Sequence, residues 1–176
     1  SEMYLSINPL PEVNLGNDTA ICDGKSIVLD AKNTGLNYIW SDGSITQEVT
    51  VTQTGVYNVE VTDEIGCLGK GEMELIVHAI PNVDLGNDTI ICIGETVTLN
   101  AQNSGFNYQW NTGASSSELI INTAGKYEVR VYDEIGCADT SEMYLSINPL
   151  PEVNLGNDVV ICEHQSLVLN AQNESL

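Results

Sequence analysis

The sequence has very little positive charge. Five lysine and arginine residues stand against 25 aspartate and glutamate residues, which gives a formal net charge of -20. A surface this acidic repels phosphate backbones and anionic lipid headgroups and attracts cations. The composition therefore argues against nucleic acid as a partner and against binding to a membrane surface.

Long apolar runs and metal-binding cysteine motifs are also missing. No stretch of about 18 apolar residues occurs, so the sequence predicts no membrane insertion. The five cysteines contain no C-x-x-C pair and have no clustered histidines beside them. Cysteines of this kind are typical of disulfides formed in an oxidising compartment. We therefore expect an extracellular protein at the cell surface.

The chain repeats itself with a period of 70 residues. The tetrapeptide at 15–18 recurs at 85–88 and 155–158, and Trp40 and Tyr57 recur as Trp110 and Tyr127. A unit of this size can enclose a small core of its own. We predict two complete repeats, residues 10–79 (repeat 1) and 80–149 (repeat 2). Residues 1–9 are expected to be the last strand of a preceding repeat, and residues 150–176 the opening strands of a third, incomplete one.

Apolar residues alternate with polar ones inside each repeat, as half-buried strands require. Ile27, Leu29 and Ala31 share one face, and glycine-containing turns separate such segments. Six or seven short strands in 70 residues predict an all-β fold of tandem Ig-like β-sandwich domains arranged end to end. The same parity places four aromatic residues in the cores: Trp40, Trp110, Tyr57 and Tyr127.

One extended pattern runs through both repeats: L-G-N-D-T-x-I-C, then a strand ending L-x-A, then N-Y-x-W, then G-x-Y-x-V-x-V-x-D-E-I-G-C. It resembles the Ig-like and PKD-like tandem repeats of SprB-type giant gliding adhesins from Bacteroidota. The resemblance implies an exported, long extracellular filament whose adhesive contact lies elsewhere in the protein.

Residues suited to catalysis are scarce. The two histidines, His78 and His164, occupy different positions of the repeat. A catalytic group is not expected to shift between copies that otherwise match closely. The sequence therefore predicts no catalytic residues and no enzyme.

Acidic residues at turns are candidates for calcium binding, since carboxylate oxygens are the ligands that this cation prefers. No D-x-D-x-D-G loop is present, so calcium is a possible ligand rather than a required cofactor. The candidate ligands are Asp18, Asp63, Glu64, Asp88, Asp133 and Glu134.

The cysteines predict a disulfide within each repeat. Cys22 and Cys67 lie 45 residues apart, as do Cys92 and Cys137, while the partner of Cys162 would lie beyond residue 176. In a regular sandwich, however, the turns that follow Cys22 and precede Cys67 lie at opposite ends. A bond between neighbouring repeats, from Cys22 to Cys137, is therefore the alternative.

Thr19 and Thr89 each stand in an Asp-Thr-aliphatic sequence. The organisms of the resembled group attach O-linked sugar to threonine in this context, so both residues are candidate O-glycosylation sites. The alternative is a plain threonine at the start of a strand.

The leading functional hypothesis is a structural stalk, whose partners are neighbouring repeats and whose surface or polysaccharide ligand is bound elsewhere. A carbohydrate- or protein-binding module is the alternative, as is a spacer attached to a secreted enzyme. A binding module should expose aromatic residues in phase on both copies. Tyr4 and Tyr144 are in phase, but Glu74 fills the place between them, which favours the stalk.

Overall fold

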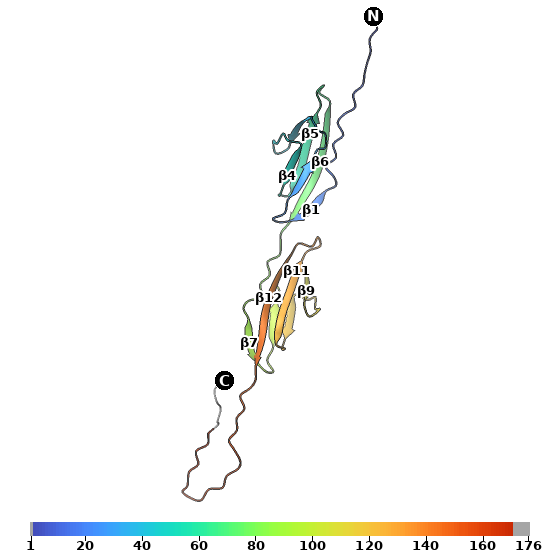
Figure 1. Ribbon diagram of the computed structural model, residues 1–176. Coiled ribbons are helices and arrows are strands. Elements are labelled where there is room, and N and C mark those ends of the chain that lie inside the picture. The colour runs from blue at the N-terminus through green and yellow to red at the C-terminus, as the bar shows by residue number, and fades with distance from the viewer. Residues whose placement is uncertain (1, 171–176) are drawn as a thin grey trace.

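The chain forms two separate β-sandwiches that follow one another along a single axis (Figure 1). This computed structural model describes residues 2–170. No helix occurs in that range, and so none that could cross a membrane. The all-β fold and the end-to-end arrangement of immunoglobulin-like sandwiches confirm the prediction from the alternating sequence pattern.

Six strands build the first sandwich from a four-stranded and a two-stranded sheet. The larger sheet has the order β1-β6-β5-β3, and β2 pairs with β4. The strands are β1 (Thr19–Cys22), β2 (Ile27–Asp30), β3 (Asn37–Trp40), β4 (Glu48–Val51), β5 (Gly55–Thr62) and β6 (Leu68–His78).

The second sandwich repeats this arrangement, with the sheets β7-β12-β11-β9 and β10-β8. Its strands are β7 (Thr89–Cys92), β8 (Val97–Asn100), β9 (Asn107–Trp110), β10 (Glu118–Ile121), β11 (Gly125–Tyr132) and β12 (Ala138–Asn148).

The first strand of each sandwich runs parallel to the last, whereas the other pairs are antiparallel. This pairing puts Cys22 beside His78, where β1 and β6 both end. We call this end the downstream pole. The turn before β6 or β12 lies at the opposite end, the upstream pole. Cys67 and Cys137 each directly precede a last strand and therefore belong to upstream poles.

Alternation along the strands places the predicted inward residues in the cores. Leu29 and Ala31 are almost fully buried, and Val28 between the inward positions is exposed. The indole rings of Trp40 and Trp110 are buried, and each ring N–H donates to a backbone oxygen six residues later, at Thr46 and Ser116. A buried indole needs such a partner, so both tryptophans are core residues, as predicted.

The tyrosines at the start of β5 and β11 form corner contacts. Tyr57 donates its hydroxyl to the backbone oxygen of Gln53 at 2.8 Å, and Tyr127 donates to that of Thr123 at 2.7 Å. Tyr127 is buried and Tyr57 half-buried. These bonds hold the connection between the two sheets of each sandwich, as the tyrosine corner of immunoglobulin folds does.

Replacing Tyr127 by phenylalanine keeps the ring but removes the bond to Thr123. We expect Tyr127→Phe to lower the free energy of unfolding of repeat 2 by about 1 kcal/mol, the usual net value of such a bond. Tyr57→Phe should cost less, because its hydroxyl is more exposed. Urea denaturation of both variants measures the difference, and an equal or larger loss for Tyr57→Phe would contradict this account.

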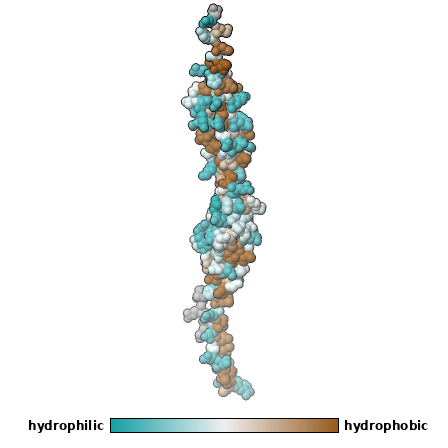
Figure 2. Space-filling model, turned by 90° about the vertical axis from the view of Figure 1, so that its right-hand side faces the viewer, coloured by the Kyte–Doolittle hydropathy of each residue, from teal (hydrophilic) through white to brown (hydrophobic). Residues whose placement is uncertain are grey.

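The segments outside the sandwiches are extended but form no strands within residues 2–170. Figure 2 shows apolar surface along them. Met3, Leu5 and Ile7 are about nine-tenths exposed. Strands were predicted in 1–9 and 150–176. The structure records no strand at 2–9 or 150–170. A strand needs a neighbouring strand, and the partners expected for these segments belong to neighbouring repeats, so this assignment stays a prediction. Residue 1 and residues 171–176 lie outside the described range.

Candidate functional site

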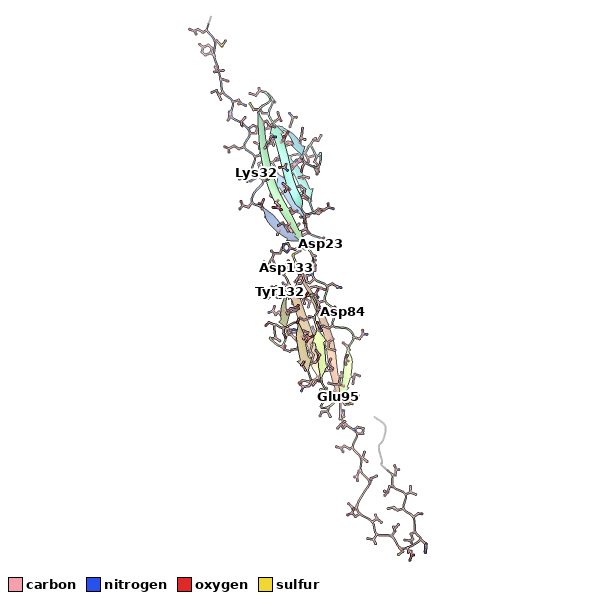
Figure 3. The ribbon with its side chains drawn as sticks, turned by 180° about the vertical axis from the view of Figure 1, so that it is seen from behind. Asp23, Lys32, Asp84, Glu95, Tyr132 and Asp133 are labelled. Carbon is pink, nitrogen blue, oxygen red and sulfur yellow. A yellow bond between two sulfur atoms is a disulfide. The ribbon has the colours of Figure 1, made fainter. Side chains whose placement is uncertain are left out.

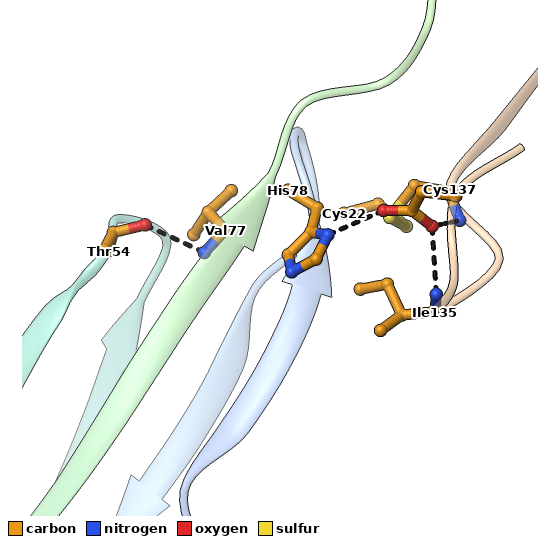
Figure 4. Close-up of polar contacts among 7 residues, drawn as sticks. Cys22, Thr54, Val77, His78, Ile135 and Cys137 are labelled. Carbon is orange, nitrogen blue, oxygen red and sulfur yellow. Dashed lines mark hydrogen bonds and ion pairs between the residues drawn. A yellow bond between two sulfur atoms is a disulfide. The ribbon is translucent and has the colours of Figure 1, made fainter. Parts of the chain in front are cut away.

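The chemically distinctive place in this molecule is the junction between the two repeats. A disulfide joins Cys22, at the downstream pole of repeat 1, to Cys137, at the upstream pole of repeat 2 (Figure 4). The two Cα atoms lie 5.4 Å apart across 115 residues of sequence. The bond therefore links neighbouring repeats covalently.

The predicted pairings of Cys22 with Cys67 and of Cys92 with Cys137 are wrong, and the alternative pairing is the one found. The reason is the position of the poles. The 11 residues of β6 separate Cys67 from the end of the strand, where Cys22 lies. At about 3.3 Å per residue this is about 35 Å, far beyond the reach of a disulfide. Cys67, Cys92 and Cys162 are free.

A second contact crosses the same junction. The Nδ1 atom of His78 lies 2.6 Å from Oδ2 of Asp133. The backbone oxygen of His78 accepts from the amide of Asp23 at 2.8 Å. His78 thus binds repeat 1 through its main chain and repeat 2 through its ring. Figure 3 shows Asp133 at the pole that faces Asp23, with Glu95 at the far pole of repeat 2.

The turn at 133–137 positions both the carboxylate and the cysteine. The Oδ1 atom of Asp133 accepts from the amides of Ile135 and Cys137, at 3.1 and 2.8 Å. Gly136 has a φ of +93°, a conformation that favours glycine. The turn leaves Oδ2 of Asp133 available for His78, and it buries Cys137 completely. The sequence D-E-I-G-C therefore encodes the docking element of the junction. We name residues 133–137, and their counterpart 63–67, the junction turns.

The junction contacts shift the acidity of Asp133. Burial raises the pKa of this carboxyl, but hydrogen bonds from His78 and from the amides of Cys137 and Ile135 outweigh burial and hold the pKa below its ordinary value. Because the folded-state pKa is lowered, the stabilisation is fully present above the ordinary aspartate pKa of 3.8. It is lost as the pH falls through the folded-state value.

We therefore expect repeat 2 to lose thermal stability as the pH falls below about 4. Asp133→Asn should lower the melting temperature at pH 7 and flatten this acid dependence, because the amide cannot gain a proton at that pH. Thermal melts between pH 2 and 7 measure both effects. Glu134→Gln is the matched control, since Glu134 is exposed in the same turn. An acid dependence unchanged in Asp133→Asn would contradict the assignment.

The candidate calcium ligands have other roles in the structure. Asp18 and Asp88 each accept a backbone amide, from Glu74 and Tyr144 respectively, and so tie the approach to β1 or β7 to the last strand. Asp63 and Asp133 organise the junction turns, in which Glu64 and Glu134 are exposed. Within residues 2–170 no group of three or more histidine, cysteine or acidic side chains could hold a metal ion. Calcium binding stays a prediction.

Thr19 and Thr89 are the first residues of β1 and β7 and are both half-buried. The hydroxyl of Thr89 donates to the backbone oxygen of Asn87. O-glycosylation at these residues stays a prediction, which intact-mass analysis of protein from its source organism would test.

Sequence reasoning missed the role of His78, although a signal was present. His78 aligns with Asn148 and with Asn8 at the 70-residue period. Histidine and asparagine differ in their acid–base chemistry, so the exchange hides the property that the two side chains share. Both can donate an N–H to a carboxylate, and that is the property the junction uses.

A shallow polar hollow on repeat 2 is a further candidate for ligand binding. Its lining includes Asn100, Gln102 and Ser117. The same positions of repeat 1 carry Asp30, Lys32 and Gln47. The two repeats therefore present different chemistry at this place, which is not what a repeated ligand site requires.

Comparison with solved structures identifies the fold. The insect immune protein hemolin, 18% identical, superposes with a TM-score of 0.52 over 80% of this chain and 47% of its own. The IG1+IG2 fragment of DIP-gamma (15% identity, TM-score 0.45) matches 79% of this chain and 98% of its own. Murine CEACAM1b (18% identity, TM-score 0.42) matches 73% and 96%. The chain spans about half of the hemolin chain.

At these identities the similarity shows an immunoglobulin-like fold. No family model matches the chain. No curated protein matches its sequence either.

Proposed function

We propose that these repeats are stalk segments of a long extracellular bacterial surface adhesin, a filament that serves surface adhesion or gliding motility. The adhesive contact, with a surface or polysaccharide ligand, lies elsewhere in the full protein. The observation that carries the proposal is the covalent bond from Cys22 to Cys137, which joins one repeat to the next.

A bond at this position restricts the movement of one repeat relative to the next, which a binding module does not need. Domains joined by a linker move relative to one another unless a large interface holds them. Here two contacts at one junction, the disulfide and the pair His78–Asp133, fix the neighbouring poles. Fixing the direction from repeat to repeat is what a stalk requires, because a stalk must hold its tip away from the cell.

The proposed location has separate support. Structural disulfides persist in oxidising compartments, and the bond from Cys22 to Cys137 is a disulfide of this kind. The bacterial source and the gliding role rest on the resemblance of the repeat pattern at 15–67 and 85–137 alone.

The alternative of a repeated binding module has weaker support. Tyr4 and Tyr144 are exposed, but Glu74 stands at the intervening position, and the polar hollow of repeat 2 is not kept in repeat 1. A spacer role beside a secreted enzyme uses the same geometry as a stalk. Reading the sequence that flanks the repeats would separate these two.

Small-angle X-ray scattering tests the mechanical part of the proposal. The oxidised protein is expected to give the maximum dimension of one fixed, extended tandem. The double variant Cys22→Ser/Cys137→Ser should give a broader and shorter distance distribution, since a single hydrogen bond then holds the junction. Cys162→Ser is the matched control and should scatter like the parent. Identical profiles for the parent and the double variant would remove the disulfide's role in setting direction.

Adhesion assays test the proposal that the adhesive contact lies outside these repeats. Beads coated with residues 1–176 are expected not to attach to glass or polysaccharide above the level of uncoated beads. Attachment that Tyr4→Ala or Tyr144→Ala abolishes would favour the binding module instead.

A further inference from the structure

The outer poles of the two repeats carry the separate halves of the junction already described. The upstream pole of repeat 1 has a junction turn at 63–67 that ends in Cys67. The downstream pole of repeat 2 carries Cys92, at the end of β7. At the 70-residue period Cys67 corresponds to Cys137, and Cys92 corresponds to Cys22. Both are free thiols in this chain.

The upstream half at repeat 1 has the geometry of the central junction. The Oδ1 atom of Asp63 accepts from the amides of Ile65 and Cys67, at 3.0 and 2.8 Å. Its Oδ2 accepts from the side-chain amide of Asn8 at 2.7 Å, as Oδ2 of Asp133 contacts His78. Asn8 also lies 3.9 Å from the sulfur of Cys67. The extended segment before repeat 1 thus occupies the place that the end of β6 takes at the central junction.

The downstream half at repeat 2 matches as well. The amide of Ile93 donates to the backbone oxygen of Asn148 at 3.0 Å, as the amide of Asp23 donates to that of His78. Cys92 is paired in register with Asn148, as Cys22 is with His78. Cys92 is exposed. A cysteine is therefore presented at this pole in the same backbone setting as the bonded one.

We propose that Cys67 and Cys92 are disulfide positions for further copies of this repeat. Cys92 bonds the cysteine at the Cys137 position of a following copy, and Cys67 bonds the cysteine at the Cys22 position of a preceding one. In each bond two thiols lose two protons and two electrons to a disulfide oxidant such as oxidised glutathione, which is reduced to two thiols. Every repeat then carries one bond at each pole and none inside.

This arrangement interlocks successive bonds. The loop closed by Cys22 and Cys137 overlaps the loop that begins at Cys92, so β8 to β11 lie inside both loops, whose bonds belong to different junctions. Cys162 takes the Cys22 position of the next copy and bonds one repeat further on. The inference deepens the proposed stalk role and rests on it.

The test completes the third repeat. Appending a copy of residues 107–149 after residue 176 restores the 70-residue unit and adds a copy of Cys137. After oxidation in a glutathione buffer, non-reducing peptide mapping is expected to show Cys22 linked to Cys137 and Cys92 linked to the appended cysteine. Alkylation should then label Cys67 and Cys162 alone, instead of the three cysteines that are free in the parent.

Two results would overturn the proposal: a link from Cys162 to the appended cysteine, or a Cys92 that alkylates fully although the third repeat is folded. Fluorescence of the appended copy of Trp110 reports that folding. Cys92→Ser is expected to leave the appended cysteine free, and the matched control Cys162→Ser is expected to leave the new link unchanged.

A second variant tests the other pole. Placing a copy of residues 80–140 before Ser1 supplies a complete preceding repeat, whose copy of Cys92 is expected to bond Cys67. Failure of the added repeat to fold at both ends would also overturn the proposal, because it requires both poles to accept a neighbour. The stalk role has a different test, which is the scattering of the Cys22→Ser/Cys137→Ser variant. If that variant scatters like the parent, the stalk role fails, whatever bonds Cys67 and Cys92 form.

Discussion

Stretching the oxidised protein from its two ends is expected to yield about 400 Å less final extension than stretching the reduced protein. The disulfide joins residues 115 apart in sequence, and a fully extended chain spans about 3.5 Å per residue. Tension that enters at the N-terminal end reaches Cys22, crosses the bond to Cys137 and continues from there. The strands β2 to β11 lie inside the closed loop and are never placed under end-to-end tension.

Force spectroscopy with handles at both termini measures this difference. The reduced protein should lengthen in two steps, one for each sandwich, whereas the oxidised protein should release only the segments outside the loop. Cys162→Ser is the control, because Cys162 lies outside the loop and should leave both traces unchanged. Equal final lengths with and without reductant would show that the load does not pass through the bond.

Trp110→Ala is expected to cost repeat 2 about 3 to 5 kcal/mol of folding free energy, the usual range for deleting a buried indole. The ring of Trp110 is 2% exposed and donates to Ser116. A domain this small has only several kcal/mol of stability in total. Repeat 2 should therefore be largely unfolded in this variant.

The chain offers an internal reporter for this experiment. Each repeat has one tryptophan, so in Trp110→Ala the remaining fluorescence comes from Trp40 and reports repeat 1. We expect Trp40 to keep a cooperative urea transition while the far-ultraviolet circular dichroism falls by about half. Ile120→Ala is the matched control, since this side chain is 70% exposed, and it should change stability by less than about 0.5 kcal/mol. A Trp110→Ala protein with two intact transitions would contradict the core assignment.

The interior of each repeat could be predicted from sequence, because side chains of a strand alternate between its two faces. Leu29 and Ala31 followed directly from that rule, and both are buried. The same rule placed Tyr127 in the core, where it is buried, and Tyr57, which is half-buried. These inferences need only local order along the chain.

The junction could not be derived in the same way. Equal spacing within each repeat favoured Cys67 as the partner of Cys22. Spacing gives only the distance along the chain, however, and does not show at which end of the sandwich a residue lies. The parallel pairing of β1 with β6 determines which end of the sandwich Cys22 occupies. Nothing in the alternation of apolar residues specifies that pairing. The acidic turn at 133–137 had the same ambiguity, because solvated carboxylates and docking carboxylates look alike in a sequence.

The loop closed by the bond also changes what a protease can achieve. Cutting the backbone at any single point between Cys22 and Cys137 leaves the two pieces attached through sulfur. Exposed turns such as the one at Gly113 lie within that range, and exposed loops are the usual sites of proteolytic nicking. A nicked molecule keeps its covalent continuity from end to end, and separating the pieces requires a reductant as well as the cut.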